Sequence, residues 1–127
     1  MKKKKLKSLS RLKKEADKVF SDYIRQRDNY TCITCGRKGD KSSIQNGHFV
    51  KRCWLSLRYS EQNCHAQCVG CNIFAGGNYD VYALKIIEKL GPNILLELNL
   101  QKHSYPMRRK DYEEIILKYQ ELLNSAS

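Results

Sequence analysis

The sequence lacks any apolar run near the roughly 20 residues that a membrane-spanning helix needs. Its first fourteen residues are basic, as at the start of a signal peptide, but no apolar segment follows them. These absences predict a cytoplasmic protein without a membrane-spanning segment. The sequence also has no internal repeat and no long low-complexity linker, so its 127 residues predict a single domain with a modest core.

Acidic residues are scarce, since 24 Lys and Arg face only 13 Asp and Glu and leave a net charge of +11. The first fourteen residues hold eight basic side chains and no acid. Such an excess favours a polyanionic partner, because each basic group that meets a phosphate releases counterions. Nucleic acid is therefore the first expectation, and an anionic membrane surface is the second.

The hydrophobic pattern divides the chain into residues 1–28, 29–92 and 93–127, which we expect to pack as one domain. In the first region, apolar residues recur at helical spacing from Leu6 to about Arg27 and predict a basic amphipathic helix. In the second, "SIQNGHFV" and "NCHAQC" predict strands among turn residues, and a helix from Tyr79 ends at Gly91. The third predicts a short helix over 93–100 and a last amphipathic helix within "RRKDYEEIILKYQELL".

Four of the six cysteines form two CxxC motifs, Cys32 with Cys35 and Cys68 with Cys71, separated by 32 residues. Two such knuckles supply the four thiolates of a closed structural Zn²⁺ site. A redox CxxC is the alternative, but the presence of two motifs and the absence of a thioredoxin-like βαβ pattern argue against it. Cys53 and Cys64 have no partner at knuckle spacing, so we expect free thiols there.

Three polar residues follow a second pattern across the same region. His48 lies near the end of the first predicted strand, Asn63 comes fifteen residues later, and Asn72 directly follows the last knuckle cysteine. A strand, a loop, a second strand and a helix that opens with a metal-liganding side chain form the layout of a ββα-metal nuclease. The predicted fold is therefore α+β, a small zinc-stapled ββα-metal core with a basic N-terminal helix and C-terminal helices.

The three positions match the HNH endonuclease motif in its HNN form, framed by the two knuckles. The chain also resembles the NinG/Rap family of lambdoid phages from about Ser21 to Tyr119, through segments that include "CITCGRKG", "NGHFVKR", "LRYSEQNCHAQCVGCN" and "GGNYDVYALKIIEKLG". This resemblance implies a structure-specific DNA endonuclease that acts on branched recombination intermediates, such as Holliday junctions or D-loops. It also implies a phage origin and the cytoplasm of a bacterial host.

Phosphodiester hydrolysis suggests a role for each residue of the motif. His48 suits the general base, because an imidazole accepts a proton near neutral pH. Asn72 offers a hard carbonyl oxygen to a catalytic Mg²⁺ or Mn²⁺. Asn63 would pin the loop between the strands and so fix His48, and Arg58 could hold a phosphate by a bidentate contact.

The residue before His48 departs from the pattern of many HNH enzymes. An Asp, Glu or His at that position is often the second metal ligand, but here the residue is Gly47. NinG-like sequences share this feature. The first candidate for a replacement ligand is His65 on the second predicted strand, followed by Asn46 or Asn78.

A non-catalytic zinc module that binds nucleic acid is the main alternative function. Charge and cysteines fit both functions, whereas a binding module has no need of the constellation formed by His48, Asn63 and Asn72. Binding to a membrane surface would account for the basic charge but for none of the motifs, so we expect DNA as the partner and no membrane. The two-fold symmetry of a four-way junction also suggests a homodimer that cuts two strands.

Overall fold

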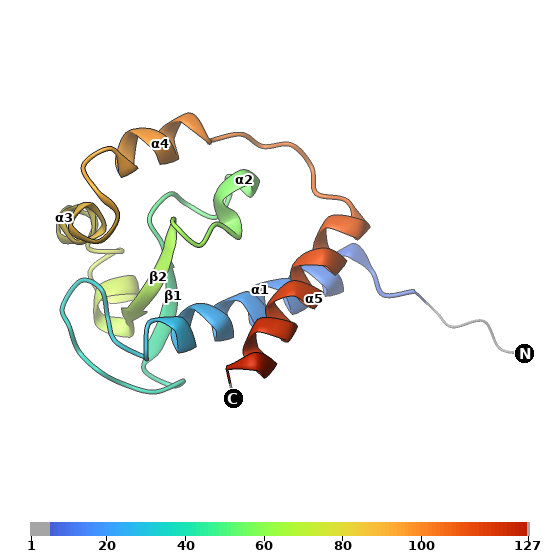
Figure 1. The fold of residues 1–127 in the computed structure, drawn as a ribbon, viewed down its shortest axis with the longest axis horizontal. Helices are drawn as coiled ribbons and strands as arrows, with labels where there is room; N and C mark the ends of the chain where they lie inside the picture. Colours follow the sequence, from blue (N-terminus) through green and yellow to red (C-terminus); the bar gives the residue numbers. More distant parts are fainter. Residues whose placement is uncertain (1–5, 127) are drawn as a thin grey trace, which may run out of the picture.

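The computed structural model describes residues 6–126, which fold into helices around a small antiparallel sheet (Figure 1). The lysine run at residues 2–5 lies outside the described residues. In chain order the elements are α1 (Leu9–Arg27), β1 (Ile44–His48), α2 (Leu55–Arg58), β2 (Cys64–Cys68), the π-helical turn η1 (Gly70–Phe74), α3 (Tyr79–Leu90), α4 (Ile94–Leu100) and α5 (Arg109–Ser125).

The predicted strands are confirmed as β1 and β2, which pair antiparallel with His48 opposite Cys64 and Asn46 opposite Ala66. Because side chains alternate across a strand, Asn46 and His48 lie on one face of the sheet and Gly47 on the other. The sheet has two strands over the described residues, and loops and helices complete the rest of the middle region.

Helix α1 begins later than the sequence pattern predicts. Ser8 is its N-cap, and the Ser8 hydroxyl accepts a hydrogen bond from the backbone amide of Arg11. Leu6, which fits the helical spacing, lies before the helix and is exposed. The inward face of α1 is buried as its periodicity predicts, through Leu12, Ala16, Val19, Phe20 and Ile24.

Helix α5 packs against α1, although the two are far apart in sequence (Figure 1). Tyr119 of α5 and Phe20 of α1 are both almost fully buried and meet edge-on, with ring centroids 4.8 Å apart. Tyr112 is buried against Leu12 and Ala16 nearer the start of α1. The C-terminal helix thus covers the long helix on which the sheet also rests.

Helices α3 and α4 bury a second group of side chains, formed by Leu57, Tyr82, Ile86, Ile94 and Leu98. The predicted end of α3 is confirmed, because Gly91 follows Leu90 with a φ of 101°, which glycine adopts readily. Tyr79 fits the same helical spacing as Tyr82, but its side chain is 39% exposed and does not belong to this buried group.

The fold is thus a mixture of helices with a small two-stranded sheet, as the α+β prediction requires. Within residues 6–126, no helix combines the length and the apolar character that crossing a membrane demands.

Candidate functional site

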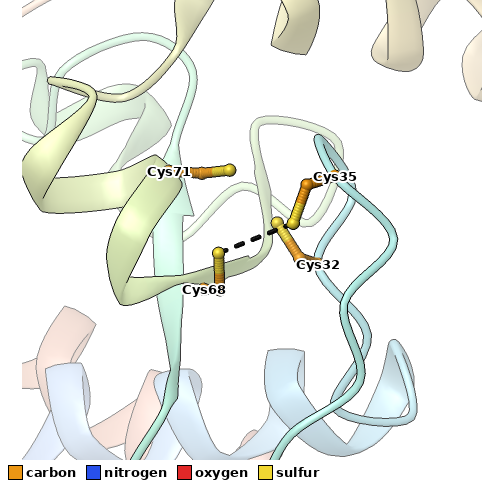
Figure 2. A group of neighbouring side chains, drawn as sticks. All are labelled: Cys32, Cys35, Cys68 and Cys71. Carbon is orange, nitrogen blue, oxygen red and sulfur yellow. Dashed lines mark hydrogen bonds between the residues drawn. The ribbon is translucent and has the colours of Figure 1, made fainter.

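The four knuckle cysteines converge in one cluster beside the sheet (Figure 2). Cys32 and Cys35 come from the loop after α1, Cys68 ends β2, and Cys71 lies in η1. All four sulfur atoms lie within 4.8 Å of one another, and the Sγ atoms of Cys35 and Cys68 are 3.6 Å apart. A tetrahedral zinc site with Zn–S bonds of about 2.3 Å places its sulfurs about 3.8 Å apart. The cluster is therefore close enough to bind a metal such as zinc.

The thiols of the cluster differ in how readily they ionise. Burial by itself would raise the pKa of Cys32, but hydrogen bonds from the Thr34 hydroxyl and backbone amides outweigh it and lower that pKa to about 6. Burial and the neighbouring thiols raise the pKa of Cys35 to about 12. Thiols this close cannot all ionise unless a metal ion offsets their mutual repulsion.

A cleft of about 760 Å³ opens between α1 and the β1 side of the sheet. His48 and Asn46 of β1 line it together with Asn72 of η1. Its rim is basic, because the lining includes Arg25, Lys51, Arg52 and Arg58 but only one acid, Asp17. The cleft therefore brings His48 and Asn72 of the predicted motif to one surface.

The ring of His48 has a defined orientation in this cleft. Its Nε2 lies 2.9 Å from the backbone oxygen of Arg58. A carbonyl oxygen can only accept, so Nε2 carries the proton and Nδ1 is left as the basic nitrogen. Burial lowers the pKa of His48 and outweighs the opposing hydrogen bond, and the charges of Arg58 and Arg52 lower the pKa further. The imidazole is therefore neutral and ready to accept a proton at pH 7.

The pattern predicts Asn72 at the start of a helix, but the structure places it within the π-helical turn η1. Its Nδ2 donates a 2.8 Å hydrogen bond to Oε1 of Gln45, which also lines the cleft. Because the amide nitrogen is used in this way, the side-chain oxygen of Asn72 remains as a ligand atom. The orientation of the Asn72 side chain therefore depends on Gln45, a residue that the HNN motif does not include.

Asn63 is fully buried and does not line the cleft. Its Oδ1 accepts a 2.7 Å bond from the Val50 amide, and its Nδ2 donates to the backbone oxygens of Val50 and Leu57 at 2.9 and 3.1 Å. These bonds close the loop between β1 and β2 around α2. Asn63 thus has contacts on both sides of this loop, as the expected role of fixing the loop requires.

Arg58 differs from its expected role. Its side chain is buried, and Nε and Nη2 contact the two carboxylate oxygens of Asp17 at 2.8 and 2.5 Å. The bidentate contact predicted for a phosphate is therefore made to Asp17. Arg58 instead reaches the site through its backbone oxygen, which orients His48.

His65 also differs from its expected role. It is 1% exposed, it does not line the cleft, and its Nδ1 lies 3.1 Å from the hydroxyl of Tyr82. Burial lowers the pKa of His65 to about 3, so the ring is neutral. His65 is therefore not brought together with His48 and Asn72 in the cleft, and its ring contacts α3 on the other side of the sheet.

Asn78, the last of the candidate ligands, lies outside the lining of the cleft. It precedes α3 in a left-handed conformation, and its Nδ2 lies 3.8 Å from the sulfur of Cys71. Cys64 is buried and Cys53 is exposed at the cleft, and both are free thiols as expected.

Fold and cluster together define a small α+β protein in which four clustered cysteines, close enough to bind a metal such as zinc, accompany a basic cleft. The model of the family described as bacteriophage Lambda NinG protein matches residues 1–127. The chain therefore belongs to the NinG family of lambdoid phage proteins.

Several ninG proteins of phages are similar to this chain. The protein of Escherichia phage 933W is 30% identical over 112 residues, which is 87% of this chain and 55% of the relative. Those of phage lambda and of Salmonella phage P22 are 29% and 30% identical over the same length and the same 87% of this chain, covering 54% and 55% of the relatives. The chain thus spans about half the length of these relatives. No solved structure matches it.

Proposed function

We propose that this protein is a metal-dependent, structure-specific DNA endonuclease of the HNH type that cuts branched recombination intermediates such as Holliday junctions or D-loops. The observation that carries the proposal is the ring of His48. Its Nε2 is held by a backbone carbonyl, and its Nδ1 is left as the base in a cleft shared with Asn72. Antiparallel strands followed by a helical turn are also the order of elements in a ββα-metal core.

In this proposal His48 takes a proton from the attacking water, and the Arg58 carbonyl stabilises the imidazolium that forms. The side-chain oxygen of Asn72 would hold a Mg²⁺ or Mn²⁺ ion, which when bound stabilises the charge on the phosphate and the leaving oxygen. A four-cysteine Zn²⁺ would keep β2 and η1, and hence Asn72, in place.

Charge supports DNA as the partner. Lys51 and Arg52 are exposed at the rim of the cleft, and the whole chain carries a net charge of +11. Basic groups at this rim would meet the phosphates that flank a scissile bond. A junction with two-fold symmetry would take two copies of the chain, one for each strand that is cut.

Cleavage of a labelled four-way junction and of its matched linear duplex tests this function. Wild type, His48→Ala and His103→Ala are compared in Mg²⁺, in Mn²⁺ and in EDTA. His103 is the matched control, because it is exposed and lies outside the cleft. We expect metal-dependent cutting that prefers the junction, falls at least about 100-fold in His48→Ala and persists in His103→Ala.

Zinc content and DNA binding are measured on the same proteins, so that a folding defect is not read as a catalytic one. Binding without cutting in any metal would reject the nuclease and leave the non-catalytic zinc module that binds nucleic acid. Equal cutting by wild type and His48→Ala would reject His48 as the base.

A further inference from the structure

We infer that Asn46 and Asn72 form a cation site built from neutral amides, which binds its ion tightly only when DNA phosphate supplies the negative charge. The inference rests on the proposed nuclease and concerns how that enzyme acquires its ion. DNA would then be a ligand of the metal site as well as the substrate.

The first feature of this site is the side-chain amide of Asn46. It lines the cleft on the same face of β1 as His48, and both polar atoms of its side chain are buried. Neither atom has a hydrogen-bond partner among the described residues. A buried amide without partners costs free energy, so such a group in a native protein calls for a ligand.

The position next to Asn46 cannot supply the second ligand. A Cβ atom on Gly47 would lie 2.0 Å from Oε1 of Gln67. Gln67 is itself buried, and its Nε2 donates a 2.9 Å bond to the backbone oxygen of Gly77. Packing therefore excludes the acidic side chain that many HNH enzymes have there, and Asn46 is the oxygen donor one residue earlier.

Asn72 lines the same cleft, and Gln45 engages its amide nitrogen, which leaves the side-chain oxygen as the available donor atom. Gln45 is thus a positioning residue for the site. Amide oxygens are hard ligands that suit Mg²⁺ and Mn²⁺, and Mg²⁺ keeps several of its waters in such sites. The two amides would hold such an ion between them without a carboxylate.

The charge around the cleft opposes a lone divalent cation. Asp17 is the one acid in the lining, and Arg58 neutralises it through a bidentate ion pair. Lys51 and Arg52 remain positive and exposed. A DNA phosphate would reverse the sign of the local potential, so the ion and the DNA should bind with strong mutual dependence.

The test measures Mn²⁺ binding by the loss of the electron paramagnetic resonance signal of free Mn²⁺, with and without a short linear duplex. All proteins are zinc-loaded and carry His48→Ala, which keeps the DNA intact, and DNA alone is subtracted. Asn46→Ala and Asn46→Asp are compared with Asn99→Ala, an exposed site on α4.

We expect DNA to tighten Mn²⁺ binding at least about tenfold in the parent and in Asn99→Ala, and far less in Asn46→Ala. Asn46→Asp should bind Mn²⁺ about tenfold more tightly than the parent without DNA, because a carboxylate brings its own charge. Asn46→Ala should unfold at a temperature no lower than the parent, since an unpartnered amide stabilises nothing.

Full DNA-dependent Mn²⁺ binding by Asn46→Ala would overturn the inference, and so would a marked fall in its unfolding temperature. Junction cleavage by the chain with His48 intact is measured alongside. If that chain cuts while Asn46→Ala binds Mn²⁺ normally, only the inference fails. If no protein takes up Mn²⁺ with DNA and nothing is cut, the proposed nuclease fails as well.

Discussion

His48 differs from the other two histidines of the chain in what its ring nitrogens meet. His48 donates to a carbonyl at the edge of a cleft, His65 is enclosed beside the Tyr82 hydroxyl, and His103 is exposed against Tyr105. The same imidazole therefore lines a cleft with one nitrogen left basic, makes a structural hydrogen bond in the interior, or lies at the surface. A base requires the first of these environments.

The pH dependence of cleavage should report the environment of His48. Burial lowers the pKa of His48 below the ordinary value of 6.5, and the charge of Arg52 lowers the pKa further. The base works only when neutral, so activity should be lost as the pH falls through this lowered pKa. We expect the acidic limb of the single-turnover rate to lie below pH 6.5.

Arg52→Gln provides the matched test of that assignment. Removing a positive charge favours the imidazolium, so the pKa of His48 rises and the acidic limb moves to higher pH. Lys38→Gln, an exposed change outside the cleft, should leave the limb unchanged. A limb that does not move in Arg52→Gln would mean that another group controls it.

At the scale of elements, α1 fixes the short helix α2. Helix α2 in turn orients His48, the candidate base. Asp17 of α1 accepts hydrogen bonds from the guanidinium of Arg58 and, at 2.7 Å, from the hydroxyl of Tyr59. Burial would raise the pKa of Asp17, but these bonds outweigh it and lower that pKa. The backbone of Arg58, which orients His48, is thereby tied to α1.

Asp17→Asn should therefore weaken both the fold and the site. The buried guanidinium of Arg58 would lose its counter-charge, so we expect the free energy of unfolding to fall by about 1–3 kcal/mol, less than for a fully buried pair because Asp17 is partly exposed. Glu15→Gln, which removes the contacts of an equally exposed carboxylate on the same helix to the exposed Lys7 and Arg11, should cost less than about 1 kcal/mol. Denaturant titrations of the two variants measure the difference, and equal losses would contradict the tethering role.

The end of α1 also protects the free edge of the sheet. A carboxylate oxygen of Asp28 accepts a bond from the Ala66 amide at 2.8 Å, and Arg27 donates to the backbone oxygen of Cys64 at 2.7 Å. The Ile33 amide donates to the oxygen of Ala66. A two-stranded sheet would otherwise leave β2 with unpaired backbone groups, so these contacts replace a third strand.

At the scale of the whole molecule, the cysteine cluster joins the loop after α1 to the end of β2 and to η1 (Figure 2). These segments contain little regular secondary structure, so a bound metal would supply much of their stability. Asn72 follows Cys71 directly, and the geometry of the cleft therefore depends on the cluster.

Cys68→Ser should abolish stoichiometric zinc binding and lower the free energy of unfolding by several kcal/mol, because three thiolates hold the ion poorly. Zinc per chain and the visible spectrum of the Co²⁺-substituted protein measure the site. Cys53→Ser is the control, since Cys53 lies outside the cluster and is exposed. Equal zinc content in the two variants would reject the four-cysteine site.

Much of the fold could be predicted from local patterns. Apolar periodicity predicted the strands, the last helix and the inward face of α1, and Gly91 predicted the end of α3. The CxxC spacing indicated the cluster. The helix α2 is too short to have a recognisable period, and η1 departs from the period of 3.6 residues. Neither could be predicted in that way.

The sequence by itself determined the basic charge, which is a matter of composition. It also determined which cysteines would cluster and the order of strand, loop and strand, because these depend on residue types at short spacings. Only the tertiary structure decided which polar groups share the cleft. It turned Arg58 towards Asp17, enclosed His65 and set the hydrogen bond of His48, and it left the side-chain amide of Asn46 without a hydrogen bond among residues 6–126. These outcomes depend on contacts between residues far apart in the chain, which no local pattern encodes.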